Sequence, residues 1–459
     1  MTDQRIVIIG GGPTGLGAGN RLKELGHENW ILLERSESFG GLASTITDQQ
    51  GFLWDLGGHV LFSHYEYFDA LLNDLLDDSW LHHIREAWIW THNRWIPYPF
   101  QNNLWRLPKN ELRKCLDGLT SLKEQPRRGE IKTFDDWIMQ SLGEGIADIF
   151  MRPYNFKVWA YPPQDLSAGW VGDRVAISDL EQLISNTESK KDDVGWGPNS
   201  TFRFPAFGGT GRIWSELASR LPKEKLLTSK TVTSIDPHSK TVSCHSGDEF
   251  EYDALISTLP MNELLKCLTD TRLFPGKSEE FQWSSTHIIG VGIEGKPPEQ
   301  LQKKCWMYFP ETNVPFYRVT VFSNYSPSNV PVPGEQWSLL CEVSESGKKV
   351  VDHDNILQET IDGLQRVGLV STTEKIISEW AKYLPYGYPT PFIGRDELLS
   401  EIEPLLRSMG IYSRGRFGGW KYEVSNQDHS LMQGVEAINH ILLNEEEITY
   451  FAPEIVNGR

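Results

Sequence analysis

The residues best suited to chemistry lie near the start of the chain, in a glycine-rich turn. Gly10, Gly12 and Gly15 follow the apolar run RIVII and precede a helix-forming stretch, and Thr14 lies inside the same turn. Glycines at this spacing let the backbone approach a pyrophosphate, which the free N–H groups of the following helix then bind. Glu34 ends the next apolar run, where a carboxylate accepts hydrogen bonds from ribose hydroxyls. The pattern predicts a dinucleotide site.

A second glycine pair, Gly40 and Gly41 followed by Leu42, comes shortly after this acid. It lets the backbone approach the far half of a long dinucleotide, a feature that NAD-binding folds do not need. Gln427 and Ser430 stand at a predicted helix start near the other end of the chain, and a helix N-terminus tolerates negative charge. We therefore predict FAD as the cofactor, with Gly41, Leu42, Gln427 and Ser430 among its contacts.

A βαβ unit must position the first turn. Residues 5–9 and 30–33 are short, apolar and rich in β-branched side chains, as buried parallel strands are, and a helical stretch lies between them. Residues 173–199 are polar and turn-rich, which predicts a mobile loop. The remaining periodicities predict helices over 110–186 and 355–369 and from about 430, strands at 231–235 and 255–259, and β structure over 280–350.

These elements predict an α/β protein built on a discontinuous doubly wound, Rossmann-like FAD-binding domain. We assign residues 1–83, 204–275 and 410–459 to that domain. A helical domain with mobile loops is expected over 108–203. An antiparallel β-sheet substrate domain is expected over 84–107 and 276–409.

Composition narrows the class of protein. The chain has 459 residues and a formal charge of −18, which disfavours nucleic acid as a partner because phosphates attract basic surfaces. An anionic substrate would then need a locally basic pocket. No apolar run is long enough to cross a bilayer, no secretory signal opens the chain, and five scattered cysteines fit reduced thiols, so we expect a cytoplasmic protein. No metal is expected, because no His/Asp/Glu group has a metal site's spacing.

Outside the cofactor motif the sequence is similar to a known family. The segments that carry the similarity are GGLAST (40–45), GGHVLFSHYEYF (57–68), PYPFQNN (97–103), FMRPYNFKVWA (150–160), WGPN (196–199), FRFPAFGGTG (202–211), residues 305–327 and SRGRFGGWKYEVSNQDHS (413–430). Together they resemble eukaryotic, fungal-type UDP-galactopyranose mutases nearly end to end. The chain departs from the fungal enzymes in two ways. It is shorter, which leaves the oligomeric state open. Its segment AFGGTGR also carries Phe207 at the position of the arginine in the fungal pattern ARGGTGG.

The resemblance implies an activity. Members of that family are isomerases that interconvert UDP-galactopyranose and UDP-galactofuranose with no net redox change. They require reduced FAD, whose N5 forms a covalent adduct with the anomeric carbon of the sugar while UDP departs. The resemblance therefore implies a UDP-sugar substrate, with NADPH as the reductant of the cofactor.

The resemblance also assigns roles to residues by their place in these motifs. Arg174 and Arg318 are implied to bind the pyrophosphate, a task suited to guanidinium forks. His59, after Gly57 and Gly58, is implied to lie against the flavin and, with the two arginines, to be catalytic. Further cofactor contacts implied are Gly57, Gly58, Val232, Arg416 and Asn426. Further substrate contacts implied are Tyr98, Phe100, Gln101, Asn155, Trp159, Asn199, Trp306, Tyr308, Tyr388 and Tyr422.

Three other readings stay open on sequence alone. A mutase of the same mechanism could act on another nucleotide sugar. An amine oxidase or protoporphyrinogen oxidase would share the cofactor domain but has no need of a diphosphate clamp. A protein of the Rab GDP-dissociation inhibitor type shares the fold without the flavin chemistry, and the GGLAST and NQDHS segments argue against it.

Overall fold

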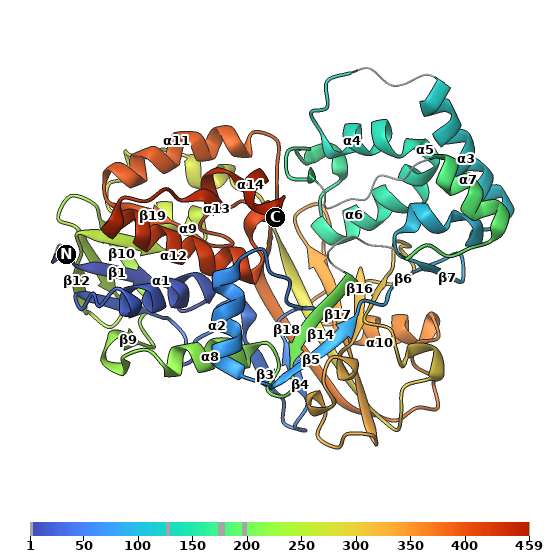
Figure 1. The fold of residues 1–459 in the computed structure, drawn as a ribbon, viewed down its shortest axis with the longest axis horizontal. Coiled ribbons are helices and arrows are strands. Elements are labelled where there is room, and N and C mark those ends of the chain that lie inside the picture. Colours follow the sequence, from blue (N-terminus) through green and yellow to red (C-terminus); the bar gives the residue numbers. More distant parts are fainter. Residues whose placement is uncertain (1–2, 125–128, 173–179, 195–199, 459) are drawn as a thin grey trace.

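A parallel sheet organises the half of the molecule that contains both chain ends (Figure 1). The computed structural model describes residues 3–124, 129–172, 180–194 and 200–458. The sheet has the strand order β19-β13-β1-β2-β9. Its strands are β1 (Ile6–Ile9), β2 (Trp30–Leu33), β9 (Leu226–Leu227), β13 (Ala254–Ser257) and β19 (Ile411–Ser413). The central strand β1 pairs with β2 and β13 and is buried throughout, as its continuous apolar run requires.

Helices cover both faces of this sheet. Ile6 and Ile8 face one core, whose helices are α1 (Pro13–Glu24), α2 (Glu66–Leu76), α8 (Gly211–Ser219) and α12 (Gln427–Leu443). Val7 and Ile9 face a second core with α9 (Met261–Cys267) and α11 (Arg395–Ser408). A small sheet of β10 (Val232–Asp236), β11 (Thr241–Cys244) and β12 (Glu249–Glu251) lies on this second side, and α13 (Ile448–Phe451) and α14 (Pro453–Asn457) end the chain. The predicted doubly wound α/β class is confirmed.

Helices α1 and α12 come from opposite ends of the sequence and cross at glycines. A Cβ added to Gly434 would lie 2.0 Å from the carbonyl oxygen of Thr14, and one on Gly17 would lie 2.6 Å from that of Leu431. Only glycine permits such an approach, so the two helices are held in direct backbone contact.

A seven-stranded sheet forms the other half of the molecule, in the order β18-β14-β17-β16-β15-β6-β7. All neighbours are antiparallel except β15 and β6. Its strands are β6 (Ala87–Thr91), β7 (Arg94–Pro97), β14 (Trp283–Glu294), β15 (Trp306–Tyr308), β16 (Arg318–Val321), β17 (Gln336–Glu345) and β18 (Ile376–Pro389). Ile289 and Val291 pack on the face covered by α10 (Ile356–Arg366), whereas Ile288 and Leu340 pack into a core on the opposite face.

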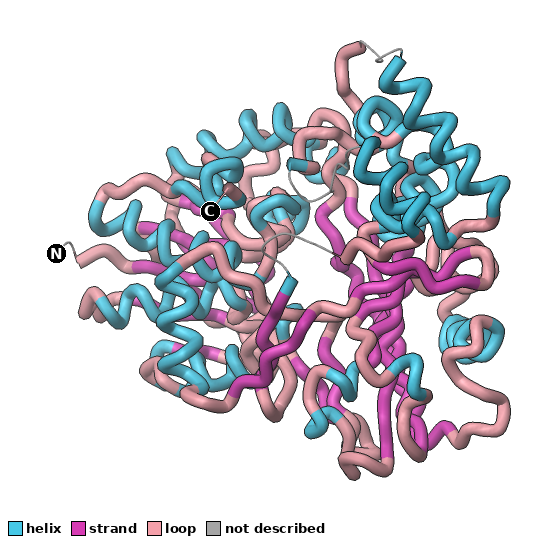
Figure 2. Tube along the Cα trace, turned by 45° about the vertical axis from the view of Figure 1, so that its right-hand side comes forward, coloured by secondary structure: helices cyan, strands magenta, loops and turns pink. Residues whose placement is uncertain are grey.

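A helical region lies at one end of this sheet (Figure 2). It comprises α3 (Lys109–Glu124), α4 (Phe134–Ser141), α5 (Gly143–Ile146), α6 (Arg152–Trp159) and α7 (Leu180–Ser189), with a π-helical turn at Ala147–Met151. Thr133 and Asp136 form a reciprocal capping box at the start of α4. A Cβ on Gly145 would lie 2.3 Å from the Lys114 carbonyl oxygen, so α3 and α5 also cross closely.

Two antiparallel ribbons join the halves. One pairs β5 (Trp80–Ile84) with β8 (Thr201–Pro205), and the other pairs β3 (Thr45–Thr47) with β4 (Leu53–Asp55). Phe52 and Trp54 of the second ribbon lie over Gly292 and Gly290 of β14, where a Cβ would come within 2.6 Å of each ring. The glycines thus leave room for the aromatic rings.

The structure differs from expectation in several places. Residues 180–189 are helical in α7, which agrees with the helices predicted up to residue 186 but not with the overlapping prediction of a mobile loop. Residues 173–179 and 195–199 lie outside the described residues. Strand β18 and helix α11 have no counterpart in the predicted elements. The predicted domain boundaries after residues 83 and 203 fall inside β5 and β8, which pair with each other. The division into three domains remains a prediction. Among the described helices, none combines the length and apolar character needed to cross a membrane.

Candidate active site

The two glycine segments predicted to hold the cofactor lie against each other. The Gly40 N–H donates to the Gly11 carbonyl over 2.8 Å, and a Cβ on Gly12 would lie 3.8 Å from the Gly40 carbonyl oxygen. Gly15 packs on the preceding turn so closely that a Cβ would lie 1.9 Å from the Gly10 carbonyl oxygen. The result is a side-chain-free cradle at the start of α1, the environment that a pyrophosphate needs.

Glu34 and the start of α12 flank this cradle. The Glu34 carboxylate is buried and accepts the N–H groups of Gly11 and Ser36 at 2.7 and 2.8 Å, which fixes it at the glycine turn. Helix α12 begins after Asn426, whose side chain makes no capping hydrogen bond in the described structure, and a helix N-terminus favours a negatively charged ligand. Gln427 accepts a hydrogen bond from the Trp214 indole at 2.8 Å, and Ser430 lies in the first turn. Both helix starts and the cradle fit a dinucleotide.

Of the other predicted cofactor contacts, Thr14, Gly41 and Leu42 lie in the two glycine segments. Val232 begins β10, two residues after Lys230, whose N–H donates to the Glu34 carbonyl oxygen at 2.8 Å. Val232 therefore lies on the Glu34 side of the cradle.

His59 lies where the two halves of the molecule meet. Burial lowers its pKa to about 4; the charge of Glu342 raises it, and those of Arg416 and Arg318 lower it. Its Nδ1 is buried and has no hydrogen-bond partner among the described residues. A neutral imidazole with an unused ring nitrogen is thus presented beside Gly57 and Gly58.

Arg318 is held by a carboxylate that the sequence analysis did not identify. Nε and Nη2 of Arg318 donate to the two oxygens of Glu342 at 2.6 and 2.7 Å, from directly paired positions on β16 and β17. Glu342 also accepts the Tyr317 hydroxyl at 2.8 Å and the Gly58 N–H at 3.1 Å. Burial alone would raise the pKa of Glu342, but Arg318 and Tyr317 hold it below its ordinary value. One carboxylate therefore joins Arg318 to the loop that carries His59.

A second arginine is enclosed by aromatic rings. Arg416 donates to the Gly387 carbonyl at 3.0 Å and to the Ser425 hydroxyl at 2.9 Å, and its Cζ lies 4.9 Å from the centre of the Tyr388 ring. Tyr422 lies 5.9 Å from Tyr388, ring centre to ring centre. Both tyrosines pack edge-on against Trp159, at 5.7 and 4.7 Å. The structure thus brings together four predicted residues from α6, β18 and the loop before α12.

The remaining predicted aromatic residues form a second group. Tyr308 lies 5.5 Å from Tyr98 and 5.2 Å from Tyr154, ring centre to ring centre. Phe100 is fully buried and stacks on Phe150 at 4.7 Å. Burial raises the pKa of Tyr154 well above its ordinary value, with a smaller effect of Tyr308 in the same direction, so its hydroxyl stays protonated and able to donate. Tyr154 is a second residue that the sequence analysis missed.

Three polar or large side chains complete the expected substrate group. Gln101 is buried, and Asn155 of α6 donates to the carbonyl of Met151, in the preceding π-helical turn, at 2.8 Å. Trp306 lies under the guanidinium of Arg85, whose Cζ is 4.7 Å from the indole ring centre. Arg174 and Asn199, also predicted here, lie outside the described residues.

A neighbouring arginine, Arg212, supplies a positive charge beside Phe207, which stands where the resemblance implied an arginine. The Cζ of Arg212 lies 3.6 Å from the centre of the half-exposed Phe207 ring, at the start of α8. Nη1 of Arg212 is buried and has no hydrogen-bond partner among the described residues. A guanidinium is therefore still present at the glycine turn, five positions further along the chain than the resemblance implied.

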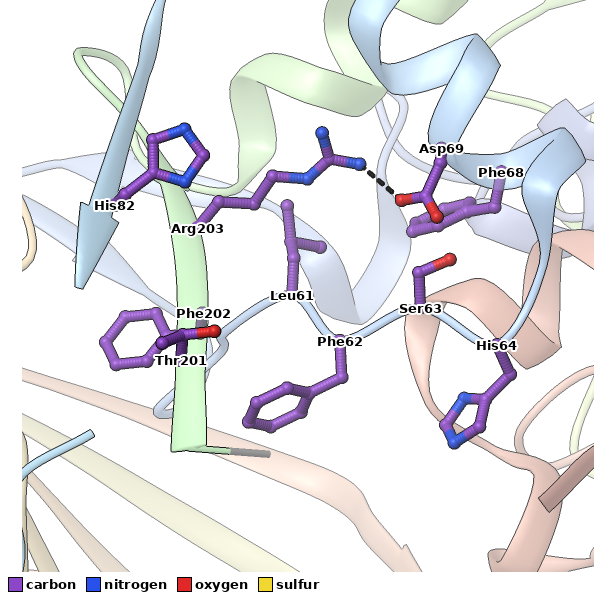
Figure 3. Close-up of a pocket in the computed structure, with 10 residues that line it drawn as sticks. All are labelled: Leu61, Phe62, Ser63, His64, Phe68, Asp69, His82, Thr201, Phe202 and Arg203. Atoms are coloured by element: carbon purple, nitrogen blue, oxygen red, sulfur yellow. Dashed lines mark hydrogen bonds and ion pairs between the residues drawn. The ribbon is translucent and has the colours of Figure 1, made fainter. Parts of the chain in front are cut away.

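The loop after His59 is fixed to the start of α12. Nδ1 of His64 lies 2.7 Å from Asp428 Oδ2, and the His64 N–H donates to the same oxygen at 3.1 Å. The same loop lines a cavity of about 250 Å³, shown in Figure 3, which β8 closes on the other side. In that view Arg203 of β8 reaches across to Asp69 of α2, with a donor–acceptor distance of 2.7 Å.

Comparison with known proteins agrees with this arrangement. Residues 13–419 match the family model described as flavin-containing amine oxidoreductase. A crystal structure of reduced UDP-galactopyranose mutase is 48% identical, with a TM-score of 0.97, and the match covers 100% of this chain and 98% of that one.

More distant structures share the fold alone. A candidate protoporphyrinogen oxidase from Exiguobacterium sp. 255-15 is 17% identical, with a TM-score of 0.74 and coverage of 97% of this chain and 100% of that one. Cyclohexylamine oxidase from Brevibacterium oxydans IH-35A is 14% identical, with a TM-score of 0.67 and coverage of 96% and 99%. The protein thus belongs to the flavin-containing amine oxidoreductase family and is similar over its whole length to UDP-galactopyranose mutase.

Proposed function

We propose that the protein is a flavin-dependent isomerase that interconverts UDP-galactopyranose and UDP-galactofuranose. The observation that carries the proposal is the Arg318–Glu342 pair: a guanidinium anchored along one edge, beside tyrosine hydroxyls and next to the flavin-side loop. Oxidation of an amine has no use for such a cation, whereas a departing nucleoside diphosphate needs one. The whole-length similarity to UDP-galactopyranose mutase supports the same substrate.

The side chain of Arg318 is held in a geometry that suits the binding of a diphosphate. Two of its nitrogens are occupied by Glu342, while Nη1 has no hydrogen-bond partner among the described residues. Its side chain keeps 19% of its surface exposed, so part of it remains open to contact with a ligand. A guanidinium fixed in advance loses little entropy on binding an oxyanion, and its charge stabilises the diphosphate most when the bond to the sugar breaks. We propose that Tyr308, Tyr388 and Tyr422 donate hydroxyl hydrogen bonds to the same phosphates.

The flavin side of the site supplies the nucleophile. Reduced FAD, which the glycine cradle and the start of α12 would hold, would supply a nucleophilic flavin nitrogen for the anomeric carbon of the sugar. We propose that the imidazole of His59 lies against the flavin ring and holds it in position. The low pKa of His59 keeps this imidazole uncharged at physiological pH. The rings of Trp159, Tyr388 and Tyr422 would exclude water from the sugar while its bond to UDP is broken.

The test is a turnover assay. Protein reduced with dithionite is incubated with UDP-galactofuranose, and the nucleotide sugars are separated by chromatography. Conversion to UDP-galactopyranose by reduced but not by oxidised protein is the expected result. Absence of conversion, together with oxygen consumption on addition of an amine, would overturn the proposal. Conversion of a different UDP-hexose alone would retain the mechanism and change the substrate.

Three finer assignments belong to the same proposal. We propose NADPH as the reductant, which anaerobic bleaching of the flavin absorbance by NADPH would test. We propose that the protein is of the eukaryotic type and works in the cytoplasm, a reducing compartment, which agrees with five free cysteines.

A further inference from the structure

Three ionisable side chains converge on the far side of the seven-stranded sheet. Nε2 of His287, on β14, and Nε2 of His353, in the turn before α10, both lie 2.8 Å from the same oxygen, Oε2 of Glu345 at the end of β17. The two imidazole rings are 4.6 Å apart, centre to centre, and nearly perpendicular at 87°. Side chains from three separate segments thus direct ligand atoms at one point.

This cluster is distinct from the active site. Side chains alternate between the faces of a strand, so Glu345 and Glu342, three residues apart on β17, project from opposite faces. His287 pairs with Val343, which packs with α10 in the core away from Arg318. The catalytic arrangement described above therefore makes no use of His287, Glu345 or His353.

We propose that His287, His353 and Glu345 bind a divalent transition-metal ion, with Zn²⁺ the best match. Two imidazoles and a carboxylate are ligands that zinc prefers, with water in the fourth position. The three ligand atoms lie within 4.8 Å of one another. Tetrahedral coordination at about 2.0–2.1 Å separates neighbouring ligand atoms by roughly 3.3 Å, so the nitrogen–oxygen distances need to lengthen by only about half an ångström.

Exposure allows an ion to enter. The His287 side chain is 5% exposed and that of Glu345 16%, but His353 is 50% exposed and forms the open side. The Tyr383 ring lies 5.0 and 4.9 Å from the two imidazoles and backs the cluster. A bound ion would clip the turn before α10 onto the sheet, which predicts a higher unfolding temperature with zinc.

One charge opposes the ion. Lys349 lies close enough to His287 to influence it, and its ammonium donates to the Ser344 carbonyl. Glu345 supplies a compensating negative charge, and the net charge of −18 favours cations over the whole surface. A Lys349→Gln substitution should therefore tighten zinc binding several-fold, because it removes the repulsion and leaves all three ligands.

The experiment uses the FAD-loaded protein after chelator treatment and dialysis, kept with a thiol reductant. Zinc chloride is titrated by calorimetry, and Co²⁺ is added separately to record its d–d absorption. One equivalent of Zn²⁺ and a four-coordinate Co²⁺ spectrum are expected. His353→Ala, in an exposed turn, and Glu345→Gln should each weaken binding by at least about 100-fold, since loss of even an outer-shell partner costs about 10–100-fold.

Matched controls separate this cluster from others. His238 is also paired with a carboxylate, Asp270 at 3.1 Å, and is 68% exposed, so His238→Ala should leave binding unchanged. His64, with Asp428 and His429, is the other described group with three candidate ligands, and His64→Ala should also have no effect. Zinc binding that survives His353→Ala, or no binding by the unmodified protein, would overturn the proposal. In that case the cluster is a hydrogen-bonded clip only.

Discussion

Two arginines, each paired with a buried glutamate, show how the same kind of ion pair can serve different ends. Arg414 is fully buried, and all three of its nitrogens are occupied: Nε and Nη2 by Glu447, Nη2 also by Glu403, and Nη1 by the Ser413 carbonyl. Arg318 makes an equally short two-point contact with Glu342 but keeps one nitrogen without a hydrogen-bond partner among the residues that the structure describes. The arginine that stabilises the fold is fully buried and has every nitrogen occupied, whereas the one that can bind a ligand is 19% exposed and has a donor to spare.

The glutamates that pair with these two arginines also differ in what they connect. Glu447 serves Arg414 and the neighbouring Arg407, so its contacts stay within α11, α13 and the adjoining loops. Glu342 serves Arg318, Tyr317 and the backbone of Gly58, and so connects the substrate-side sheet to the flavin-side loop. We expect substitutions in the first pair to change stability and substitutions in the second to change turnover.

The largest effect is expected from Arg414→Met. It leaves two buried carboxylates, Glu403 and Glu447, with Arg407 as their remaining ionic partner. Breaking a buried ion pair by removing one side costs about 3–5 kcal/mol. Unfolding in denaturant, followed by fluorescence, should show the lower midpoint. Protein that remains folded should turn over normally. A large loss of turnover per bound FAD would show that Arg414 also contributes to the active site.

Arg318→Ala should give the opposite result. Removing one preorganised donor from a developing negative charge costs about 10²–10³-fold in rate, or roughly 2.7–4 kcal/mol. The mutase assay, normalised to bound FAD by absorbance, measures the loss. FAD content should stay at the wild-type level, because Arg318 does not contribute to the glycine cradle. Near-normal turnover would remove Arg318 from the site.

Glu342→Gln should have a smaller effect than either. Glutamine keeps the shape but not the charge, so Arg318 is held less firmly and the Gly58 N–H loses a charged acceptor. We expect turnover to fall about tenfold, equivalent to about 1.4 kcal/mol. Glu342→Asp, which keeps the charge on a shorter side chain, should recover part of it. Equal losses in both variants would indicate a packing role alone.

The smallest effect concerns the titration of His59. Its folded pKa of about 4 lies below its ordinary 6.5, so the unfolded chain binds more protons between these values and stability falls as the pH is lowered through that window. His59→Asn should flatten this part of the stability curve.

The two partners of His59 should act in opposite directions. NMR of isotope-labelled histidine should show a higher His59 pKa in Arg318→Ala and a lower one in Glu342→Gln, because a positive and a negative charge are removed respectively. Shifts of the same sign would contradict this account.

The cofactor side was predictable because its signal is local. The glycine turn, its flanking elements and Glu34 lie within one βαβ unit, so spacing alone defines their geometry. Glu342 could not be placed in this way, since its partners are β16 and the loop at Gly58. A signal was present nonetheless: a carboxylate inside the apolar strand QWSLLCEVSE must have a buried partner.

The unpredicted elements share a physical reason. Strand β18 contains Pro385 and ends at Pro389, and proline in a strand is tolerated at a sheet edge, which is where β18 lies. Helix α11 carries Pro404 within its length, which disguises an otherwise amphipathic pattern. The His287, Glu345 and His353 cluster escaped notice because its members are distant in sequence and meet only through the sheet.

The glycine crossing of α1 and α12 has a consequence for biosynthesis. The first half of the nucleotide cradle is made within the opening residues, but its counterpart arrives only when Gln427–Leu443 emerges from the ribosome. The nascent chain therefore has to be synthesised through α12 before flavin can be captured tightly. We expect incorporation of the cofactor to be a post-translational event, and chains that terminate prematurely to be colourless.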